Sequence, residues 1–283
     1  MTTLIIGGSG FLGAELIRQA TAAGQATAAT YATRPGDSVQ AVWYPLDLRD
    51  AGRLGAVMSE VSPQVIINAS SGGADWAVTA QAPIRLAMTA ARHGVRLVHV
   101  SSDAVFSGAR VHYDESSLPD PITPYGAAKA AAETGILAVY PEAVVARTSL
   151  IIGDGGSAHE RLVHELAVGT RDGVLFTDDI RCPVHVADLA AALLELASGD
   201  SSGVHHVAGP DAVSRHELGV LIARRDGLDA SSLPTGRRID SPLPGALDVR
   251  LDSRATQRKL STTLRGARAV LHGPAAFEEG GSA

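Results

Sequence analysis

The feature that most constrains the fold is a glycine-rich turn directly after the first apolar run. Leu4-Ile5-Ile6 has the composition of a buried strand, and Gly7-Gly8-Ser9-Gly10-Phe11-Leu12-Gly13 follows it. Glycines at positions 7, 10 and 13 suit a tight strand-to-helix turn whose backbone approaches a ligand and whose helix packs closely on the strand. The pattern therefore predicts a βα unit in which free N–H groups at the helix N-terminus bind a pyrophosphate.

Two alternatives to a dinucleotide-binding turn need consideration. A P-loop requires Gly-Lys-Ser/Thr at the start of the helix, but Phe11-Leu12 stands there. A glycine-rich loop without a ligand stays open on the turn alone. If a dinucleotide binds, the turn residues expected to contact it are Gly7, Ser9, Gly10, Phe11, Leu12 and Gly13.

The first half of the chain alternates strand-like and helix-like segments. Apolar or β-branched runs predict strands at residues 3–6, 26–31, 65–68, 97–101 and 143–148, and Ala- and Leu-rich stretches predict helices at 13–23, 80–93 and 125–140. Strands that are apolar on both faces and separated by helices are typical of a parallel sheet covered on both sides. The predicted fold class is α/β, a doubly wound parallel sheet of the Rossmann type, with residues 1–153 as the dinucleotide-binding domain.

The composition changes after Gly153. The glycine-rich segment 153–157 predicts a flexible connection, and residues 154–283 are predicted to form mainly a smaller C-terminal lobe. Helices are expected there near residues 159–167 and 215–223, and a strand near 204–208.

Three residues suggest hydride-transfer chemistry. Tyr125 and Lys129 are four apart in a predicted helix and share one face, and a nearby ammonium lowers the pKa of a phenol from its usual value of about 10. Ser102 follows a predicted strand, so its hydroxyl lies at the carboxyl edge of the sheet and can orient a carbonyl oxygen. Alone, a Tyr–Lys pair is usually an ordinary surface pair. With the glycine turn, it predicts a site in which Tyr125 donates a proton to the carbonyl oxygen and Lys129 binds the nicotinamide ribose.

The ends of the other strands predict the type of cofactor. Tyr31-Ala32-Thr33-Arg34 has no acidic residue for the ribose hydroxyls, and Arg34 can pair with a 2′-phosphate. This favours NADP, with NAD as the alternative, although a solvated loop arginine explains Arg34 nearly as well. Asp47 and Leu48 follow the third strand near the expected adenine, where Asp47 also fits a turn residue. Asn68, Ala69 and Ser70 end the fourth strand and are expected to contact the cofactor as well.

Composition limits the remaining function classes. The net charge is −6 and no basic stripe is present, so nucleic acid is not an expected partner. No apolar run approaches the roughly 20 residues of a membrane span. Ten histidines and one cysteine, Cys182, show no ligand spacing, so no metal is expected. The single cysteine and the lack of an apolar leader favour a reducing, cytoplasmic compartment.

Together these segments are similar to the extended short-chain dehydrogenase/reductase family and, within it, to dTDP-4-dehydrorhamnose reductase and related sugar-nucleotide reductases. The resemblance covers the chain to about Leu260 and is carried by residues 7–13, 98–108, 124–129, 147–149, 181–190 and 203–209. It implies that residues 184–197 return to the nucleotide domain and that the rest of the lobe binds substrate. The implied activity is NADPH- or NADH-dependent reduction of a 4-keto nucleotide sugar. The expected partner is therefore a small-molecule nucleotide sugar, and a homodimer stays open.

Three positions depart from the family pattern. Ala104 stands where the reductases usually carry an aromatic residue and the dehydratases a glutamate, Leu150 where the sugar reductases have tryptophan, and Ser107 where they have aspartate. Without that glutamate, dehydration lacks its expected acid or base. The departures predict carbonyl reduction in a reshaped substrate pocket. Two alternatives stay open: an epimerase that retains its cofactor, and a non-catalytic nucleotide-binding regulatory subunit.

Overall fold

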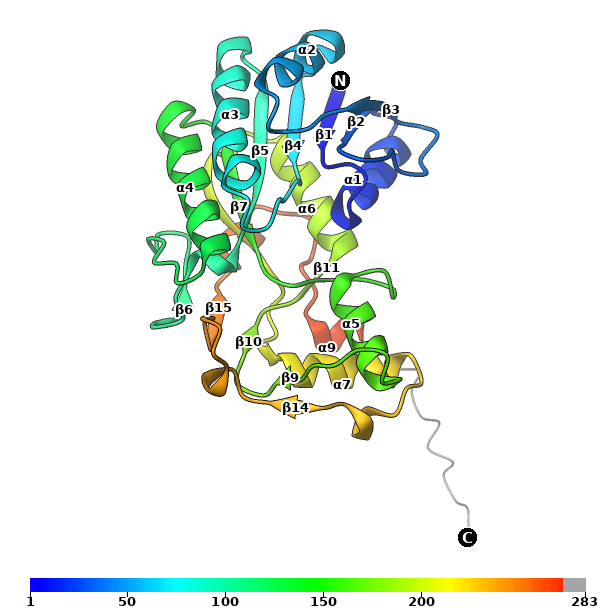
Figure 1. Ribbon diagram of the computed structural model, residues 1–283. Helices are drawn as coiled ribbons and strands as arrows, with labels where there is room; N and C mark the ends of the chain where they lie inside the picture. Colours follow the sequence, from blue (N-terminus) through cyan, green and yellow to red (C-terminus); the bar gives the residue numbers. More distant parts are fainter. Residues whose placement is uncertain (272–283) are drawn as a thin grey trace.

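A seven-stranded parallel sheet forms the centre of the computed structural model, which describes residues 1–271 (Figure 1). All neighbouring strands in it are parallel. The spatial order is β12 (Gly203–Val207), β7 (Val144–Thr148), β5 (Arg96–Ser102), β4 (Val65–Asn68), β1 (Thr2–Ile6), β2 (Ala26–Tyr31) and β3 (Val42–Pro45). The order reverses between β1 and β4, and folds of this type bind ligands in the crevice at such a point. The predicted doubly wound α/β fold is confirmed.

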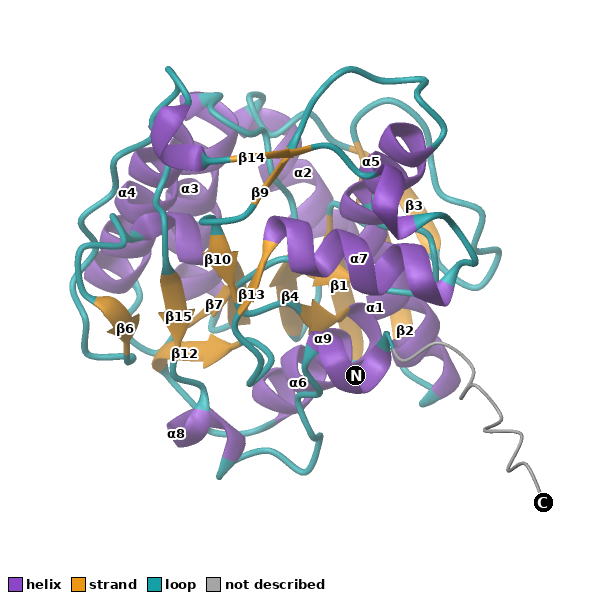
Figure 2. Ribbon diagram, turned by 90° about the horizontal axis from the view of Figure 1, so that it is seen from below, coloured by secondary structure: helices purple, strands orange, loops and turns teal. Residues whose placement is uncertain are grey.

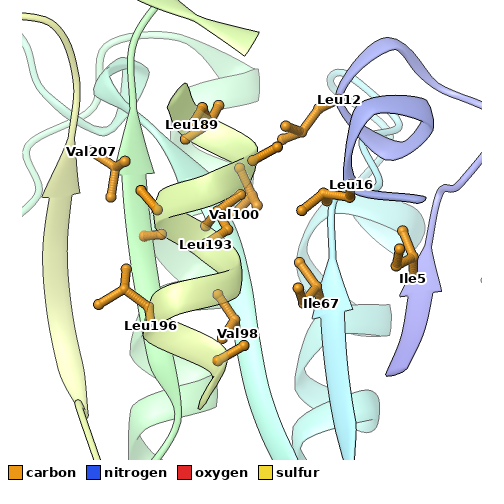
Figure 3. Packing of buried hydrophobic residues seen from close by; sticks show 14 of the residues in the cluster. Ile5, Leu12, Leu16, Ile67, Val98, Val100, Leu189, Leu193, Leu196 and Val207 are labelled. Carbon is orange, nitrogen blue, oxygen red and sulfur yellow. The ribbon is translucent and has the colours of Figure 1, made fainter. Parts of the chain in front are cut away.

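Helices cover both faces of the sheet. One face carries α1 (Phe11–Ala22) and α6 (Val186–Ser198), and the other carries α2 (Ala51–Val61), α3 (Ala82–His93) and α4 (Pro124–Val139). Figure 3 shows the first face, whose packed apolar side chains include Ile5, Leu12, Leu16, Ile67, Val98, Val100, Leu189, Leu193 and Leu196. Each such leucine or isoleucine, fully buried, stabilises the fold by roughly 1.5–3 kcal/mol. Successive strand residues point to opposite faces, so one sheet supports two cores.

The C-terminal lobe has a core of its own. Figure 2 looks from this lobe toward the sheet, with α5 (Ala158–Ala167) and α7 (Arg215–Arg225) in front. Around them lie α9 (Ala267–Val270), β9 (Leu175–Phe176) and β14 (Thr235–Gly236), and the buried lobe residues include Val163, Leu166, Leu218 and Ile222.

Short ladders pair further segments outside the central sheet. β8 (Ile151–Ile152) pairs with β11 (Val184–His185) within the sheet domain, and β10 (Ile180–Arg181) pairs with β13 (Val213–Ser214) within the lobe. β6 (Val111–Tyr113) of the sheet domain pairs with β15 (Val249–Leu251) of the lobe and so connects the two. The remaining elements are single turns, namely the π-helix η1 (Ala77–Gln81), the 3-10 turns η2 (Asp103–Val105), η3 (Ala230–Ser232) and η4 (Arg238–Asp240), and the short helix α8 (Arg254–Gln257). Within residues 1–271, no helix has the length and apolar character needed to cross a bilayer.

The chain returns to the sheet domain for longer than the sequence predicted. The predicted return, residues 184–197, contains most of α6, which packs on the sheet. β12 also belongs to the sheet, because it pairs with β7 from Gly203 to Val207. The return therefore extends to Val207, and the lobe is correspondingly smaller than the predicted 154–283. Residues 272–283 of that prediction lie outside the described part.

Candidate active site

The glycine turn has the geometry that its spacing predicts. Gly7 has φ +81°, a left-handed conformation that favours glycine, and its carbonyl accepts a hydrogen bond from the Gly10 amide at 3.1 Å. A Cβ atom on Gly13 would lie 2.2 Å from the Gly7 carbonyl oxygen. The start of α1 is thus pressed against the end of β1, and glycine is required at both positions.

Two adjoining hollows follow the carboxyl edge of the sheet. The first, which we call the turn hollow, has a volume of about 440 Å³, and the second, the tyrosine hollow, has about 500 Å³. Ala69, Ser70 and Ser71 line both, so the two spaces meet at the end of β4. Among the predicted cofactor contacts, the turn hollow brings together Gly7, Ser9, Gly10, Asp47, Leu48, Ala69 and Ser70, while Phe11 and Leu12 line the tyrosine hollow.

Arg34 lies in a third hollow beside the glycine turn. Residues 32–37 and Ser9 line this space, and Ser9 also lines the turn hollow. The arginine therefore lies on the loop after β2, next to the turn, where the sequence placed a 2′-phosphate.

Three predicted cofactor contacts have other roles in the structure. Asn68 is buried behind the wall of the hollow, where its Oδ1 accepts hydrogen bonds from the amide and hydroxyl of Ser70 and its amide meets Nδ1 of His99 at 3.1 Å. Gly13 packs against the turn and does not line either hollow. The Asp47 carboxylate accepts from the Arg49 amide at 2.9 Å, which makes it a turn residue as well as part of the wall.

Ser102, Tyr125 and Lys129 line the same tyrosine hollow. Thr123 caps α4 by accepting from the Gly126 amide at 3.0 Å, so Tyr125 lies in the first turn of the helix. A Cβ atom on Gly126 would lie 2.1 Å from the carbonyl oxygen of Ala104. This close approach holds the first turn of α4 against the segment that follows β5, and it thereby brings Tyr125 to Ser102.

The electrostatics of the tyrosine differ from the sequence expectation. Burial raises the pKa of Tyr125, the Asp103 carboxylate adds to the rise, and the hydroxyls of Ser102 and Ser71 oppose it. The sequence predicts that Lys129 lowers the pKa of Tyr125, and this prediction is wrong, because the pKa is raised. The Lys129 ammonium donates a hydrogen bond to the Val100 carbonyl oxygen at 2.9 Å. Lys129 is only 3% exposed, and burial lowers its own pKa to about 8.

A buried ion pair holds the face of α4 that carries Tyr125 and Lys129. Glu133, one helical turn beyond Lys129, pairs with Arg147 of β7 at 2.8 Å, and each side chain is 3% exposed. Glu133 also accepts a hydrogen bond from the Ser101 hydroxyl of β5. These contacts join α4 to two strands of the sheet, and the carboxylate counteracts part of the fall in the pKa of Lys129.

The lobe supplies a wall of the tyrosine hollow that the sequence did not reveal. It includes His159, Arg181 and Arg215, which lie far apart in the chain, and Ser149 of the sheet domain lines the hollow beside them. Two local signals were available: His159 and Arg215 each follow within two residues of a serine that caps a helix, Ser157 for α5 and Ser214 for α7. Such positions show where a helix begins, but not which site it faces.

Two of the three departures from the family pattern affect the hollow. Ala104 and Leu150 line it, so their side chains shape the space beside Tyr125. Ser107 does not line it. Its amide and hydroxyl instead donate hydrogen bonds to Asp120. Among residues 1–271, no three histidine, cysteine or carboxylate side chains gather as a metal site.

Comparison with known proteins decides the family. The model of the RmlD substrate binding domain family matches residues 1–272. The chain belongs to this family. This confirms the resemblance to the sugar-nucleotide reductases that the sequence motifs indicated.

Three relatives illustrate the proteins to which this chain is similar. A dTDP-4-dehydrorhamnose reductase of Mycobacterium tuberculosis is 33% identical over 205 residues, which are 69% of this chain and 67% of the relative. A probable low-salt glycan biosynthesis reductase, Agl14 of Haloferax volcanii, is 28% identical over 264 residues, 87% of each chain. A methionine adenosyltransferase 2 subunit beta of Xenopus laevis is 29% identical over 209 residues, 67% of this chain and 61% of the relative.

Solved structures share the whole fold. A hypothetical dTDP-4-dehydrorhamnose reductase from Sulfolobus tokodaii superposes with a TM-score of 0.80 at 28% identity, covering 94% of this chain and 97% of that one. A Bacillus anthracis dTDP-4-dehydrorhamnose reductase, solved in complex with NADP, gives a TM-score of 0.79 at 20% identity, covering 95% and 96%.

Proposed function

We propose that the protein is an NADPH-dependent reductase of a keto group on a nucleotide sugar, with Tyr125 as the proton donor. The observation that carries the proposal is the arrangement of the two hollows. Ser102, Tyr125 and Lys129 line one of them, and it shares Ala69, Ser70 and Ser71 with the other, which is built on the glycine turn. A nicotinamide dinucleotide spans two such spaces, and membership of the RmlD family supports the same substrate class.

The residues around the turn hollow fit a dinucleotide. Gly7 has a left-handed backbone conformation, and Gly13 packs against the Gly7 carbonyl oxygen. The start of α1 therefore lies close to the end of β1, where the free N–H groups of the helix suit a pyrophosphate. Arg34, beside Ser9, suits the 2′-phosphate that distinguishes NADP from NAD. A Bacillus anthracis protein of the same fold has been solved with NADP, which agrees with this choice.

Each catalytic side chain has a distinct task in the proposal. A dinucleotide held at the glycine turn would supply the hydride that reduces the carbonyl carbon. The Ser102 hydroxyl donates a hydrogen bond to the substrate oxygen and orients the carbonyl. Tyr125 gives its proton to that oxygen. The ammonium of Lys129 would hold the nicotinamide ribose.

Tyr125→Phe tests the proton donor. We expect turnover, followed as NADPH oxidation with nucleotide-sugar ketones, to fall about 100-fold or more, since general acid catalysis commonly contributes that much. NADPH binding, followed by fluorescence, should persist. Tyr140→Phe is the matched control, because Tyr140 ends the same helix and its hydroxyl donates to the Val95 carbonyl oxygen away from the hollow. Wild-type turnover in Tyr125→Phe would show that another group is the acid.

Arg34→Ala tests the choice of cofactor. We expect it to weaken NADPH binding more than NADH binding, because only NADPH carries the 2′-phosphate. Arg18→Ala removes the same charge from the exposed surface of α1 and should change neither affinity. Equal losses for both nicotinamides in Arg34→Ala would remove the basis for NADP preference.

A regulatory subunit is the second candidate. It is favoured by the similarity to a protein named as the beta subunit of methionine adenosyltransferase 2. Stoichiometry separates the alternatives. A reductase consumes one NADPH for each ketone reduced, an epimerase that retains its cofactor consumes none, and a regulatory subunit binds NADPH without turnover.

A further inference from the structure

A cluster of arginines lies where the lobe meets the tyrosine hollow. Asp179, only 2% exposed, pairs with Arg181 at 3.1 Å, Arg215 at 3.3 Å and Arg238 at 3.2 Å. Asp103, on the wall of the hollow, lies 3.8 Å from Arg181. The Asp178 carboxylate accepts hydrogen bonds from the backbone amides of Arg238 and Ile239. Within residues 1–271, the three guanidinium groups therefore share Asp179 and Asp103 as their ion-pair partners.

Two of the three arginines are committed to the fold. Arg181 is 10% exposed and donates hydrogen bonds to the carbonyl oxygens of Ile180 and Ala246. Arg238 lies 4.1 Å from the centre of the Phe176 ring and does not line the hollow. These contacts already engage the guanidinium groups of Arg181 and Arg238, so neither is expected to bind a ligand.

Arg215 is the arginine of this cluster that can donate hydrogen bonds to a ligand. Its side chain lines the hollow and is 26% exposed. Nε donates to Asp179, and one terminal nitrogen lies 3.4 Å from Nδ1 of His159. The other terminal nitrogen donates to no group within residues 1–271.

His159 adds a second donor to the same wall. Burial, together with the charge of Arg215, lowers the pKa of His159 to about 4, so the ring is neutral near pH 7. Since Nδ1 accepts from Arg215, the proton of the neutral ring resides on Nε2. His159 also lines the hollow, so an imidazole N–H and a guanidinium offer hydrogen bonds from one side.

We propose that Arg215 and His159 bind an anionic oxygen group, a phosphate or a carboxylate, of the substrate that Tyr125 reduces. This deepens the proposed function, on which it rests, by naming the chemistry of the substrate. A guanidinium presents paired donors that match phosphate and carboxylate oxygens, and such bonds strengthen in a partly buried site. The diphosphate of a nucleotide sugar and the carboxylate of a sugar acid both provide this group.

Calorimetric titration with dTDP, and separately with malonate, tests the proposal. Wild-type protein should bind at least one of these anions, and Arg215→Met should weaken that binding at least tenfold. Arg224→Met is the control, because Arg224 is an exposed residue near the end of the same helix and its loss changes the net charge equally. It should leave the affinity within about twofold. Arg215→Lys keeps the charge but loses the paired donors, so we expect an intermediate loss.

The outcomes separate this inference from the proposed function. Binding of dTDP alone identifies a phosphate site, and binding of malonate alone identifies a carboxylate site. NADPH titration of the same variants shows that they are folded. Tyr125→Phe should keep the anion affinity even though turnover is lost. The inference is overturned if wild-type protein binds neither anion, or if Arg215→Met, folded by the NADPH criterion, binds as tightly as wild type.

Discussion

Lys129 should destabilise the protein near neutral pH, and its replacement by methionine tests this. The side chain is 3% exposed, and burial lowers its pKa from 10.5 to about 8. A shift of that size corresponds to about 3 kcal/mol of lost stability while the amine is charged. Methionine keeps the apolar stem but loses the hydrogen bond to the Val100 carbonyl oxygen, which costs about 1 kcal/mol. At pH 7, Lys129→Met should therefore be more stable than wild type by about 2 kcal/mol.

The pH dependence makes this prediction specific. Below pH 8 the lysine is charged in both the folded and the unfolded state, so the burial cost is complete. Between pH 8 and 10.5 the folded protein releases the proton first, and wild type gains stability as the pH rises. Above that range both states are neutral, and only the lost hydrogen bond separates the proteins. The variant should then be less stable than wild type by about 1 kcal/mol.

Urea denaturation at a series of pH values measures the difference. Lys259→Met is the control, because Lys259 is the other lysine of the chain and is exposed. Its effect on the free energy of unfolding should be small and independent of pH. A loss of stability in Lys129→Met at pH 7, or a difference that does not change sign toward high pH, would refute the reasoning. Since the proposed function needs this ammonium, the more stable variant should be inactive, as is common at catalytic sites.

Two other substitutions probe the packing around the site. Glu133→Gln leaves the buried Arg147 without a counter-ion and should cost about 3–5 kcal/mol in urea denaturation. Glu60→Gln, in an exposed pair, should cost less than about 1 kcal/mol, and equal costs would contradict the argument. Gly13→Ala places a methyl group 2.2 Å from the carbonyl oxygen of the preceding turn and should weaken NADPH binding at least tenfold by fluorescence titration. Gly55→Ala, where a Cβ atom meets nothing within 4 Å, should not.

The sheet domain was predictable because its signals are local. Residues 26–31 and 65–68 form strands with the predicted bounds, since each apolar run is enclosed by turns or helices. The glycine turn needed only thirteen residues of sequence. The predicted helix at 80–93 begins earlier, as the π-helix Ala77–Gln81, because spacing of apolar residues does not show how a helix starts.

The site was predictable only in part, because its geometry depends on contacts between distant segments. The sequence shows that Tyr125 and Lys129 share one face of a helix. It does not show that the Lys129 ammonium donates to the Val100 carbonyl oxygen of β5. The contact between Gly126 and Ala104 joins residues 22 positions apart, and Arg215 meets Asp179 across 36. No periodicity records such pairs, so the direction of the tyrosine pKa and the charge of the lobe wall came only from the structure.

The two shifted pKa values together predict how the proposed reduction depends on pH. Because burial raises the pKa of Tyr125, the phenol enters the reaction protonated, as a proton donor must. The ammonium of Lys129 must also be present to hold the nicotinamide ribose, and burial lowers its pKa to about 8. Reduction, measured as kcat/KM, should be level below pH 8 and fall above it. In Glu133→Gln the fall should begin at lower pH, because the carboxylate that raises the pKa of Lys129 is gone. A rate that rises through pH 8–9 would mean that the reaction uses the neutral amine or the phenolate, and the assignment of Tyr125 as the acid would fail.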